Sequence, residues 1–265
     1  MKPVPLTKTR FTMAMECPRK LDYARDKSYY DARSNDELLQ SLAEGGHQVG
    51  ELARQMYPGG IMVEDFAADD QVKTTQDLLT RHDVTIFEAT IRHLNLLVRC
   101  DILVKRGNQV SLIEVKAKGF DPTADQFLSK KGAEPIISSW RPYLYDVAYQ
   151  AHVLGLAHPG LTVTPYLYLL DKSVAVAIPG LNTMLPVTTV GRRVTVSVAP
   201  SFDARQLNPS VLHLVDVSSE VEQLLAHPVD VSGQPQRFEE FVAHLSDVLS
   251  KGQSFPVNVG PSCKK

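Results

Sequence analysis

Three charged residues on two neighbouring strand-like runs have the types and spacing of a hydrolytic metal site. Asp101 lies in LNLLVRCDILVKR, while Glu114 and Lys116 lie in QVSLIEVKAK, two residues apart and so on one face of a strand. Two carboxylates from adjacent strands can hold Mg²⁺. A lysine beside them can orient or deprotonate a water and offset charge on a phosphate. The trio predicts metal-assisted hydrolysis of a phosphodiester, provided that the strand register brings the three together.

The same residues have a plainer interpretation. Short charged patterns of this kind occur often by chance, as solvated charges at the edge of a sheet. The apolar neighbours Leu103 and Leu112 favour the functional interpretation, because charges in a row between them need partners. Spacing alone leaves both interpretations open.

The elements that must position these residues predict a mixed α/β fold. The turn RGNQ joins the two runs and indicates an antiparallel hairpin, and VTIFEATI is a strand before it. YLYDVAYQAHVLGLA is a helix whose apolar stripe is Leu144, Val147, Ala148, Ala151 and Leu154, and LTVTPYLYLLD is a further strand. Upstream, DQVKTTQDLLT is a short helix, and DELLQSLAEGGHQVGELARQMYPGG is a longer one whose apolar stripe is Leu38, Leu42, Val49, Leu52, Ala53 and Met56. Residues 176–200 suggest an extra hairpin, and two helices follow it.

The composition is that of an ordinary globular chain and excludes several classes of protein. The 265 residues are 43% hydrophobic and 22% charged, with a net charge of −2, so a polyanion would need a local basic groove. No apolar run is long enough to cross a bilayer, and MKPVPLTKTR does not have the pattern of a secretory signal. Three widely spaced cysteines argue against a disulfide framework and favour the cytoplasm.

Several segments, in the right order, resemble the RecB-like branch of the PD-(D/E)XK nuclease superfamily. RCDILVK and LIEVKAK resemble its core hairpin, GHQVGELARQMYPGG its first helix, TIFEATI the strand before its aspartate, and YDVAYQAHVL its glutamine helix. The chain is most similar to an uncharacterised bacterial family related to CRISPR-associated iron–sulfur exonucleases. The resemblance covers about residues 5–175. It implies a restriction-endonuclease-like core, which is a mixed central sheet flanked by helices.

The resemblance assigns the reaction to four residues of this chain. It implies that Asp101 and Glu114 are the metal carboxylates and that Lys116 is the catalytic lysine. Gln150 would orient the site or the DNA. The branch often has a tyrosine four residues later, where this chain has Leu154, so no tyrosine contact to substrate is expected there.

Four further residues follow from the same resemblance. His47 and Val115 would be additional ligands of Mg²⁺ or Mn²⁺, and Glu88 and Asp146 would support the site from beside it. Periodicity alone makes His47 a surface histidine, because it lies opposite the apolar stripe of its helix. Asp146 lies one turn from Gln150, on the border of another stripe.

Cysteines near both ends of the chain also match the iron–sulfur relatives. Spacing alone gives no metal site, and each lone cysteine, Cys100 above all, is by itself a small buried hydrophobe. The relatives imply that Cys17 in FTMAMECPRKLDY and Cys263 in VGPSCKK bind a [4Fe–4S] cluster. Such a cluster needs four thiolates, so we expect that only a longer form of the chain would hold it.

Aromatic and basic residues near the glutamine helix have two interpretations. They can stack on single-stranded bases and contact phosphates, or pack at the rim of the core and remain solvated. These residues are Lys130, Lys131, Trp140, Arg141, Tyr143, Tyr145 and Tyr149.

Together these patterns predict one nuclease-like domain over residues 1–265. It would comprise an N-terminal helical part (1–80), a catalytic α/β core (81–175) and a C-terminal extension (176–265) that we expect to be incomplete. The expected activity is Mg²⁺- or Mn²⁺-dependent hydrolysis of DNA, as an exonuclease acting on ends or single strands in repair or defence. The alternative is an inactive nucleic-acid-binding or scaffold module with the same fold. No membrane partner is expected.

Overall fold

The computed structural model describes residues 4–26, 28–29, 36–64, 67–129, 136–190, 193–230 and 235–256. Within these ranges the strands are β1 (Leu6–Thr7), β2 (Ile61–Met62), β3 (Asp83–His93), β4 (Leu96–Arg106), β5 (Gln109–Phe120), β6 (Thr162–Asp171), β7 (Val187–Val190), β8 (Arg193–Val196) and β9 (Leu212–Asp216). The α-helices are α1 (Lys8–Glu16), α2 (Lys20–Arg25), α3 (Glu37–Gln55), α4 (Ala68–Leu79), α5 (Arg141–Ala157), α6 (Ser218–Ala226) and α7 (Phe238–Ser250). Short 3₁₀ turns span Leu181–Met184 and Ala204–Gln206.

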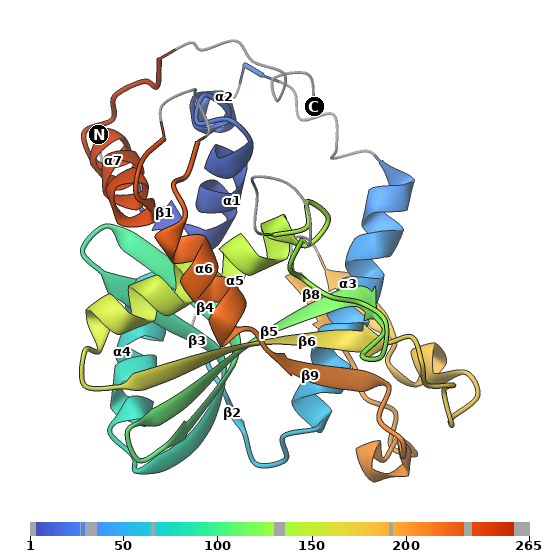
Figure 1. Cartoon of the computed structure of the whole chain (residues 1–265). Helices are drawn as coiled ribbons and strands as arrows, with labels where there is room; N and C mark the ends of the chain where they lie inside the picture. Colours follow the sequence, from blue (N-terminus) through green and yellow to red (C-terminus); the bar gives the residue numbers. More distant parts are fainter. Residues whose placement is uncertain are drawn as a thin grey trace.

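The main sheet has the strand order β2-β3-β4-β5-β6-β9, with β1 paired to β4, and β7 and β8 form a separate hairpin (Figure 1). The predicted hairpin between β4 and β5 is confirmed, because Arg106 pairs with Gln109 and Gly107 turns with a φ of +59°. After β5, α5 carries the chain to β6, which runs parallel to β5. The expected mixed α/β class, with a central sheet flanked by helices, is confirmed.

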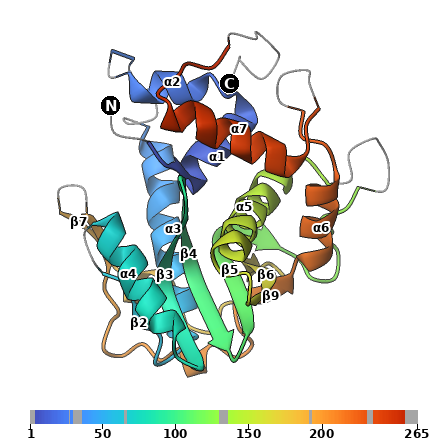
Figure 2. The same ribbon diagram turned by 90° about the vertical axis from the view of Figure 1, so that its left-hand side faces the viewer.

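One face of the sheet is covered by α5. Its predicted stripe is buried at Leu144, Val147, Ala148 and Leu154, but so is the polar Gln150. α5 is enclosed because α1, α6 and α7 gather around it (Figure 2). A helix buried on nearly all sides leaves its polar residues in need of internal partners. Within the described ranges, no helix is both long enough and apolar enough to cross a membrane.

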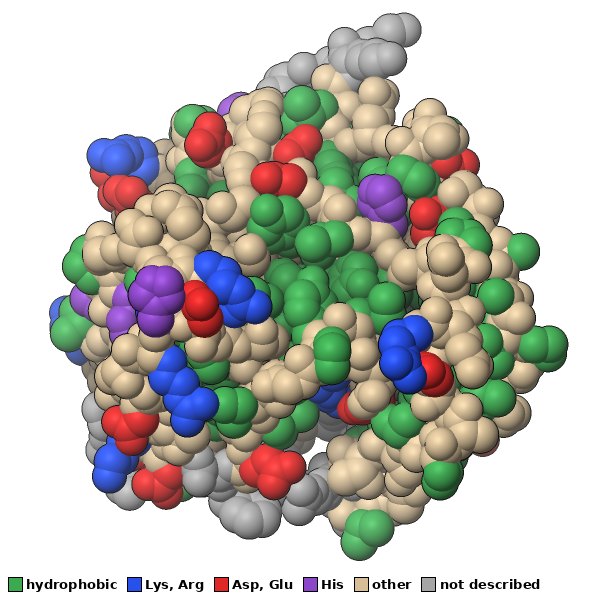
Figure 3. All heavy atoms as spheres, turned by 90° about the horizontal axis from the view of Figure 1, so that it is seen from below, with side chains coloured by type: hydrophobic (Ala, Val, Ile, Leu, Met, Phe, Trp, Pro, Cys, Tyr) green, Lys and Arg blue, Asp and Glu red, His purple; other side chains and the backbone are tan. Residues whose placement is uncertain are grey.

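The opposite face is covered by the C-terminal half of α3. Leu52 and Ala53 pack there with Ile102 and Ile113 of the sheet. The first part of the predicted stripe was assigned wrongly. Leu38 is 70% and Leu42 62% exposed, because no other described segment covers these side chains in the N-terminal half of α3. Seen from below, hydrophobic side chains gather in a hollow at the middle of the molecule (Figure 3).

β3 and β4 both change the side on which they bury residues, at the same level of the sheet. Ile86 and Ala89 pack into the core beneath α5 although they are three positions apart in the strand, and so do Cys100 and Leu103. A strand of period two would place each pair on opposite faces. The switch in β3 occurs at Glu88, whose φ is +56°. Few residues other than glycine adopt this left-handed region.

Candidate functional site

The candidate site lies where β4 and β5 stop pairing. Along these two fully described strands, the ladder ends at the pair Ile102 and Ile113. At the next position a side chain replaces the backbone partner, because Asp101 Oδ2 accepts a 2.8 Å hydrogen bond from the Val115 N–H. This register places Asp101 next to Glu114 on the adjoining strand. The structure therefore brings the two predicted carboxylates together.

Glu114 is the centre of the site and is only 1% exposed. Its Oε1 lies 2.6 Å from Lys116 Nζ and accepts a 2.9 Å bond from Lys8 Nζ. Its Oε2 accepts a 3.1 Å bond from the same Lys8 ammonium and a 2.7 Å bond from Gln150 Nε2. Two ammonium groups and an amide thus compensate one buried carboxylate, as the cost of burying a charge requires.

α5 supplies the second layer of the site through Asp146 and Gln150. Lys116 Nζ donates a 2.6 Å hydrogen bond to Asp146 Oδ2, so this lysine joins two carboxylates. Among the described residues, Asp146 Oδ1 and Gln150 Oε1 are buried side-chain oxygens without a hydrogen-bond partner. Both atoms are hydrogen-bond acceptors, so a water molecule or a cation would supply the partner that each of them lacks.

Lys8 is the residue of this site that sequence reasoning missed. It is the first residue of α1, whose N-terminus is capped by Thr7. β1 pairs with the start of β4 at Leu6 and Leu96, and the Tyr149 hydroxyl donates a 2.6 Å bond to the Leu6 carbonyl. The N-terminal segment thus delivers Lys8 to Glu114. One local signal existed, because a helix dipole disfavours a lysine in the first turn.

The charged groups of this cluster strongly shift one another's pKa values. Burial and repulsion from Glu114 raise the pKa of Asp101 to about 7 and that of Asp146 to about 6. Burial would raise the pKa of Glu114 too, but Lys8 and Lys116 outweigh it and hold that pKa below its usual value. Burial would lower the pKa of each lysine, but the carboxylates outweigh it and raise both pKa values. Glu114 and the two lysines are therefore ionised near neutral pH.

The donor set fits a hard divalent cation that keeps most of its water. Mg²⁺ is commonly bound through one or two carboxylates, which Asp101 and Glu114 can provide, and the uncompensated oxygens of Asp146 and Gln150 can accept from metal-bound water. The described residues contain no group of three His, Cys, Asp or Glu side chains placed to hold one ion. The site therefore does not fit a cation that is fully enclosed by protein ligands.

The remaining predicted ligands lie apart from the cluster or contribute differently. His47 is exposed on α3 and is not grouped with the two carboxylates, so its role as a metal ligand stays a prediction. Val115 contributes its N–H to Asp101, and its role as a metal ligand stays a prediction. Glu88 lies on β3, opposite Asp101 on the neighbouring strand β4. Its carboxylate is paired with Arg54 at 3.2 Å and with Arg99 at 3.3 Å.

Most of the predicted stacking residues are part of the core. Trp140, Tyr145 and Tyr149 are buried, so the packing interpretation is confirmed for them and the stacking interpretation is wrong. Lys118, two residues beyond Lys116, has its ammonium 4.6 Å from the Trp140 ring centroid and 5.0 Å from that of Tyr143. Aromatic faces thus hold a second cation along the same strand.

Two of the three cysteines, Cys17 and Cys100, lie among the described residues. Cys100 is fully buried in the sheet, as expected, and Cys17 is buried at the end of α1. Both are free thiols. Cys263, like Lys130 and Lys131, lies outside the described residues, so the iron–sulfur cluster stays a prediction.

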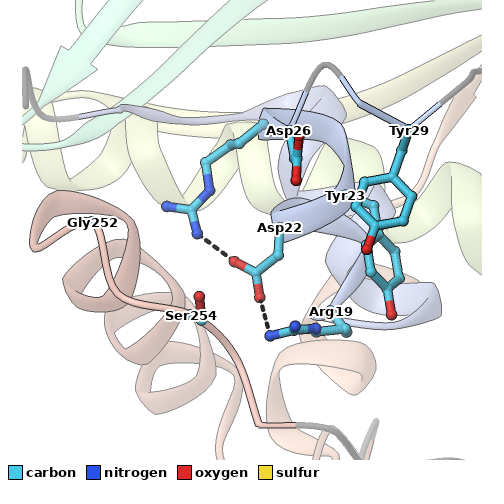
Figure 4. Close-up of a pocket in the computed structure, with 8 residues that line it drawn as sticks. Arg19, Asp22, Tyr23, Asp26, Tyr29, Gly252 and Ser254 are labelled. Atoms are coloured by element: carbon cyan, nitrogen blue, oxygen red, sulfur yellow. Dashed lines mark hydrogen bonds and ion pairs between the residues drawn. The ribbon is translucent and has the colours of Figure 1, made fainter.

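A clasp joins α2 to the last described segment of the chain. Asp22 pairs with Arg19 at 2.9 Å and with Arg25 (Figure 4). It also accepts a 2.8 Å bond from the Phe255 N–H. Arg25 also donates to the Gln253 carbonyl at 2.8 Å. Arg19, Asp22 and Arg25 line a pocket of about 340 Å³ together with Gly252 and Ser254. The clasp holds the C-terminal segment against the helix that follows Cys17.

Comparison with known proteins does not place this chain in a family. No protein-family model matches it, and a search of the curated proteins found no match. The chemistry of the site therefore has to be argued from its own residues.

Proposed function

We propose that this chain is a metal-dependent nuclease that hydrolyses phosphodiester bonds in DNA. One observation carries the proposal. Asp101, Glu114, Lys116 and Gln150, which come from three elements, meet where β4 and β5 separate. A chance row of edge charges would be solvated, whereas Glu114 is buried and fully compensated.

Each residue of the cluster would have a separate role in the hydrolysis. A bound Mg²⁺ or Mn²⁺ would supply an activated water and positive charge at the leaving oxygen. Asp101 and Glu114 would hold that ion. Gln150 fixes Glu114 through its amide, and Asp146 fixes Lys116 at 2.6 Å. Lys116, held as a donor between two carboxylates, would orient the water and offset charge on the phosphate.

The substrate class is proposed from the resemblance to RecB-like nucleases. It suggests exonuclease action on DNA ends or single strands, in repair or defence. Because the net charge of the chain is −2, DNA contacts must come from local cations. Lys118 is such a cation, since the Trp140 and Tyr143 rings hold it on the strand that carries Lys116.

Cleavage of labelled linear DNA tests the proposal. The full chain is incubated with single- and double-stranded DNA and Mn²⁺, beside Asp101→Asn, Lys116→Met and an EDTA control. We expect both variants to lose about 100-fold or more of the cleavage rate, because each removes a group acting on the reacting atoms. Asp77→Asn, on the exposed side of α4, is the matched control and should cleave like wild type. Closed circular DNA should be spared by an exonuclease.

Two results would contradict the assignment. Equal cleavage by wild type and Asp101→Asn would mean that the activity lies elsewhere. If none of the proteins cuts DNA but all of them bind it, the chain is an inactive binding module with this fold.

A further inference from the structure

Glu114 has little room for a metal ion while its present partners remain. Each of its oxygens accepts from two groups: Oε1 from Lys8 and Lys116, Oε2 from Lys8 and Gln150. A carboxylate oxygen has about two lone pairs to offer. A cation that binds Glu114 therefore has to displace one of these partners.

Lys8 is the partner that can leave. Lys116 is held by two carboxylates at 2.6 Å each, and Gln150 is completely buried. Among the described residues Lys8 forms its ion pair with Glu114 alone, over the longer distances of 2.9 and 3.1 Å. Its side chain is 25% exposed, so the ammonium can move to water at the end of its flexible stem.

We propose that Lys8 is an internal counter-ion that takes the place of the metal cation on Glu114 and gives way when that cation binds. This inference rests on the proposed metal site. Lys8 then has two effects. It stabilises the metal-free protein by compensating a buried carboxylate, and it lowers the affinity of the site for a divalent cation. The site would bind its metal ion only when the metal concentration is high enough for the ion to displace the Lys8 ammonium group from Glu114.

The charges of the cluster support this exchange. The cluster has three carboxylates, Asp101, Glu114 and Asp146, and two lysines, so its formal charge is −1 when all five are ionised. A divalent cation added beside both lysines would leave a net positive cluster, whereas departure of Lys8 removes that excess. Coulomb repulsion between neighbouring cations near a protein surface is large enough to change affinity about tenfold or more.

Calorimetric titration of the metal-free full-length chain with MnCl₂ tests the inference without relying on cleavage. Lys8→Met and Lys8→Gln remove the charge, and we expect both to bind Mn²⁺ about tenfold more tightly than wild type. Lys8→Arg keeps the charge and should bind no more tightly than wild type. Lys20→Met is the matched control, because Lys20 is 27% exposed and pairs with Glu16, outside the cluster. It should match wild type.

The outcomes separate this inference from the proposed function. If wild type binds Mn²⁺ and Asp101→Asn binds it more weakly, but the neutral Lys8 variants bind no more tightly, the counter-ion role is wrong and the metal site stands. If Asp101→Asn binds Mn²⁺ as well as wild type does, the metal site itself is misplaced and both ideas fail. Should one neutral variant not fold, the other decides the outcome.

Discussion

Asp101 differs from the other two carboxylates of the cluster in its compensation. Glu114 contacts two ammonium groups and Asp146 contacts one, whereas the hydrogen bond found for Asp101 in the described residues is from a backbone N–H. Burial and repulsion from Glu114 therefore raise its pKa to about 7. A site that awaits a divalent cation has this property, because the metal supplies the missing positive charge.

Replacing Asp101 with Asn should stabilise the metal-free protein at pH 8. The pKa of Asp101 rises from its usual value of 3.8 to about 7 in the folded chain. The contribution of the Asp101 carboxyl group to stability is therefore fully present below pH 3.8 and is lost as the pH rises through about 7. Asn cannot ionise and still accepts from the Val115 N–H. In EDTA, the melting temperature of Asp101→Asn should exceed that of wild type at pH 8, and the difference should shrink towards pH 5. A difference in melting temperature that does not change with pH would show that ionisation of Asp101 does not destabilise the fold.

At the scale of the elements, β3 and β4 change the face on which they bury residues at the level of Asp101. Glu88 adopts a φ of +56° at the point where both strands change faces, across from Asp101. A left-handed conformation at a residue other than glycine costs about 1–2 kcal/mol. The pairs with Arg54 and Arg99 hold the Glu88 side chain in place. Strained backbone beside a candidate site is consistent with a functional geometry.

Two truncations of Glu88 should separate its backbone from its side chain. Glu88→Ala and Glu88→Gly both remove the pairs with Arg54 and Arg99, but only glycine adopts a positive φ freely. We expect Glu88→Gly to be more stable than Glu88→Ala by about 1 kcal/mol in urea denaturation. If the alanine variant is equally or more stable, the backbone at this position is not strained.

At the scale of the whole molecule, the site depends on segments far apart in the chain. Lys8 and Glu114 are 106 residues apart, and the N-terminal segment that carries Lys8 is fixed by β1 on β4 and by Tyr149 of α5. The clasp at Asp22 joins α2, which follows α1, to residue 255. Loss of the clasp should therefore loosen the N-terminal helices.

Asp22→Ala should lower the free energy of unfolding by about 1–3 kcal/mol, because it leaves the Phe255 N–H and two arginines without their shared acceptor. Asp247→Ala is the control, since Asp247 is 53% exposed and pairs with Lys251 at the surface. It should change stability by no more than about 0.5–1 kcal/mol. Chemical denaturation measures both, and amide hydrogen exchange should quicken across α2 in Asp22→Ala alone. Equal effects of the two variants would mean that the clasp does not stabilise the fold.

Local patterns predicted most of the elements around the site. Strand-like runs of residues identified β3, β4 and β5, the Gly-Asn turn fixed the register of the hairpin, and the stripe of α5 was largely right. The register then placed Asp101 beside Glu114 as expected. The stripe of α3 failed at Leu38 and Leu42, because periodicity shows that a face is apolar and not that another element covers it.

The sequence by itself determined which side chains can do chemistry and on which strand or helix face they lie, because those properties depend on residues a few positions apart. The tertiary structure decided how the charges are compensated. It brought Lys8 to Glu114, enclosed Gln150 and left His47 in solvent. Burial and ion pairing depend on which distant segments of the chain come into contact. A short stretch of sequence does not specify those contacts, so only the tertiary structure determines them.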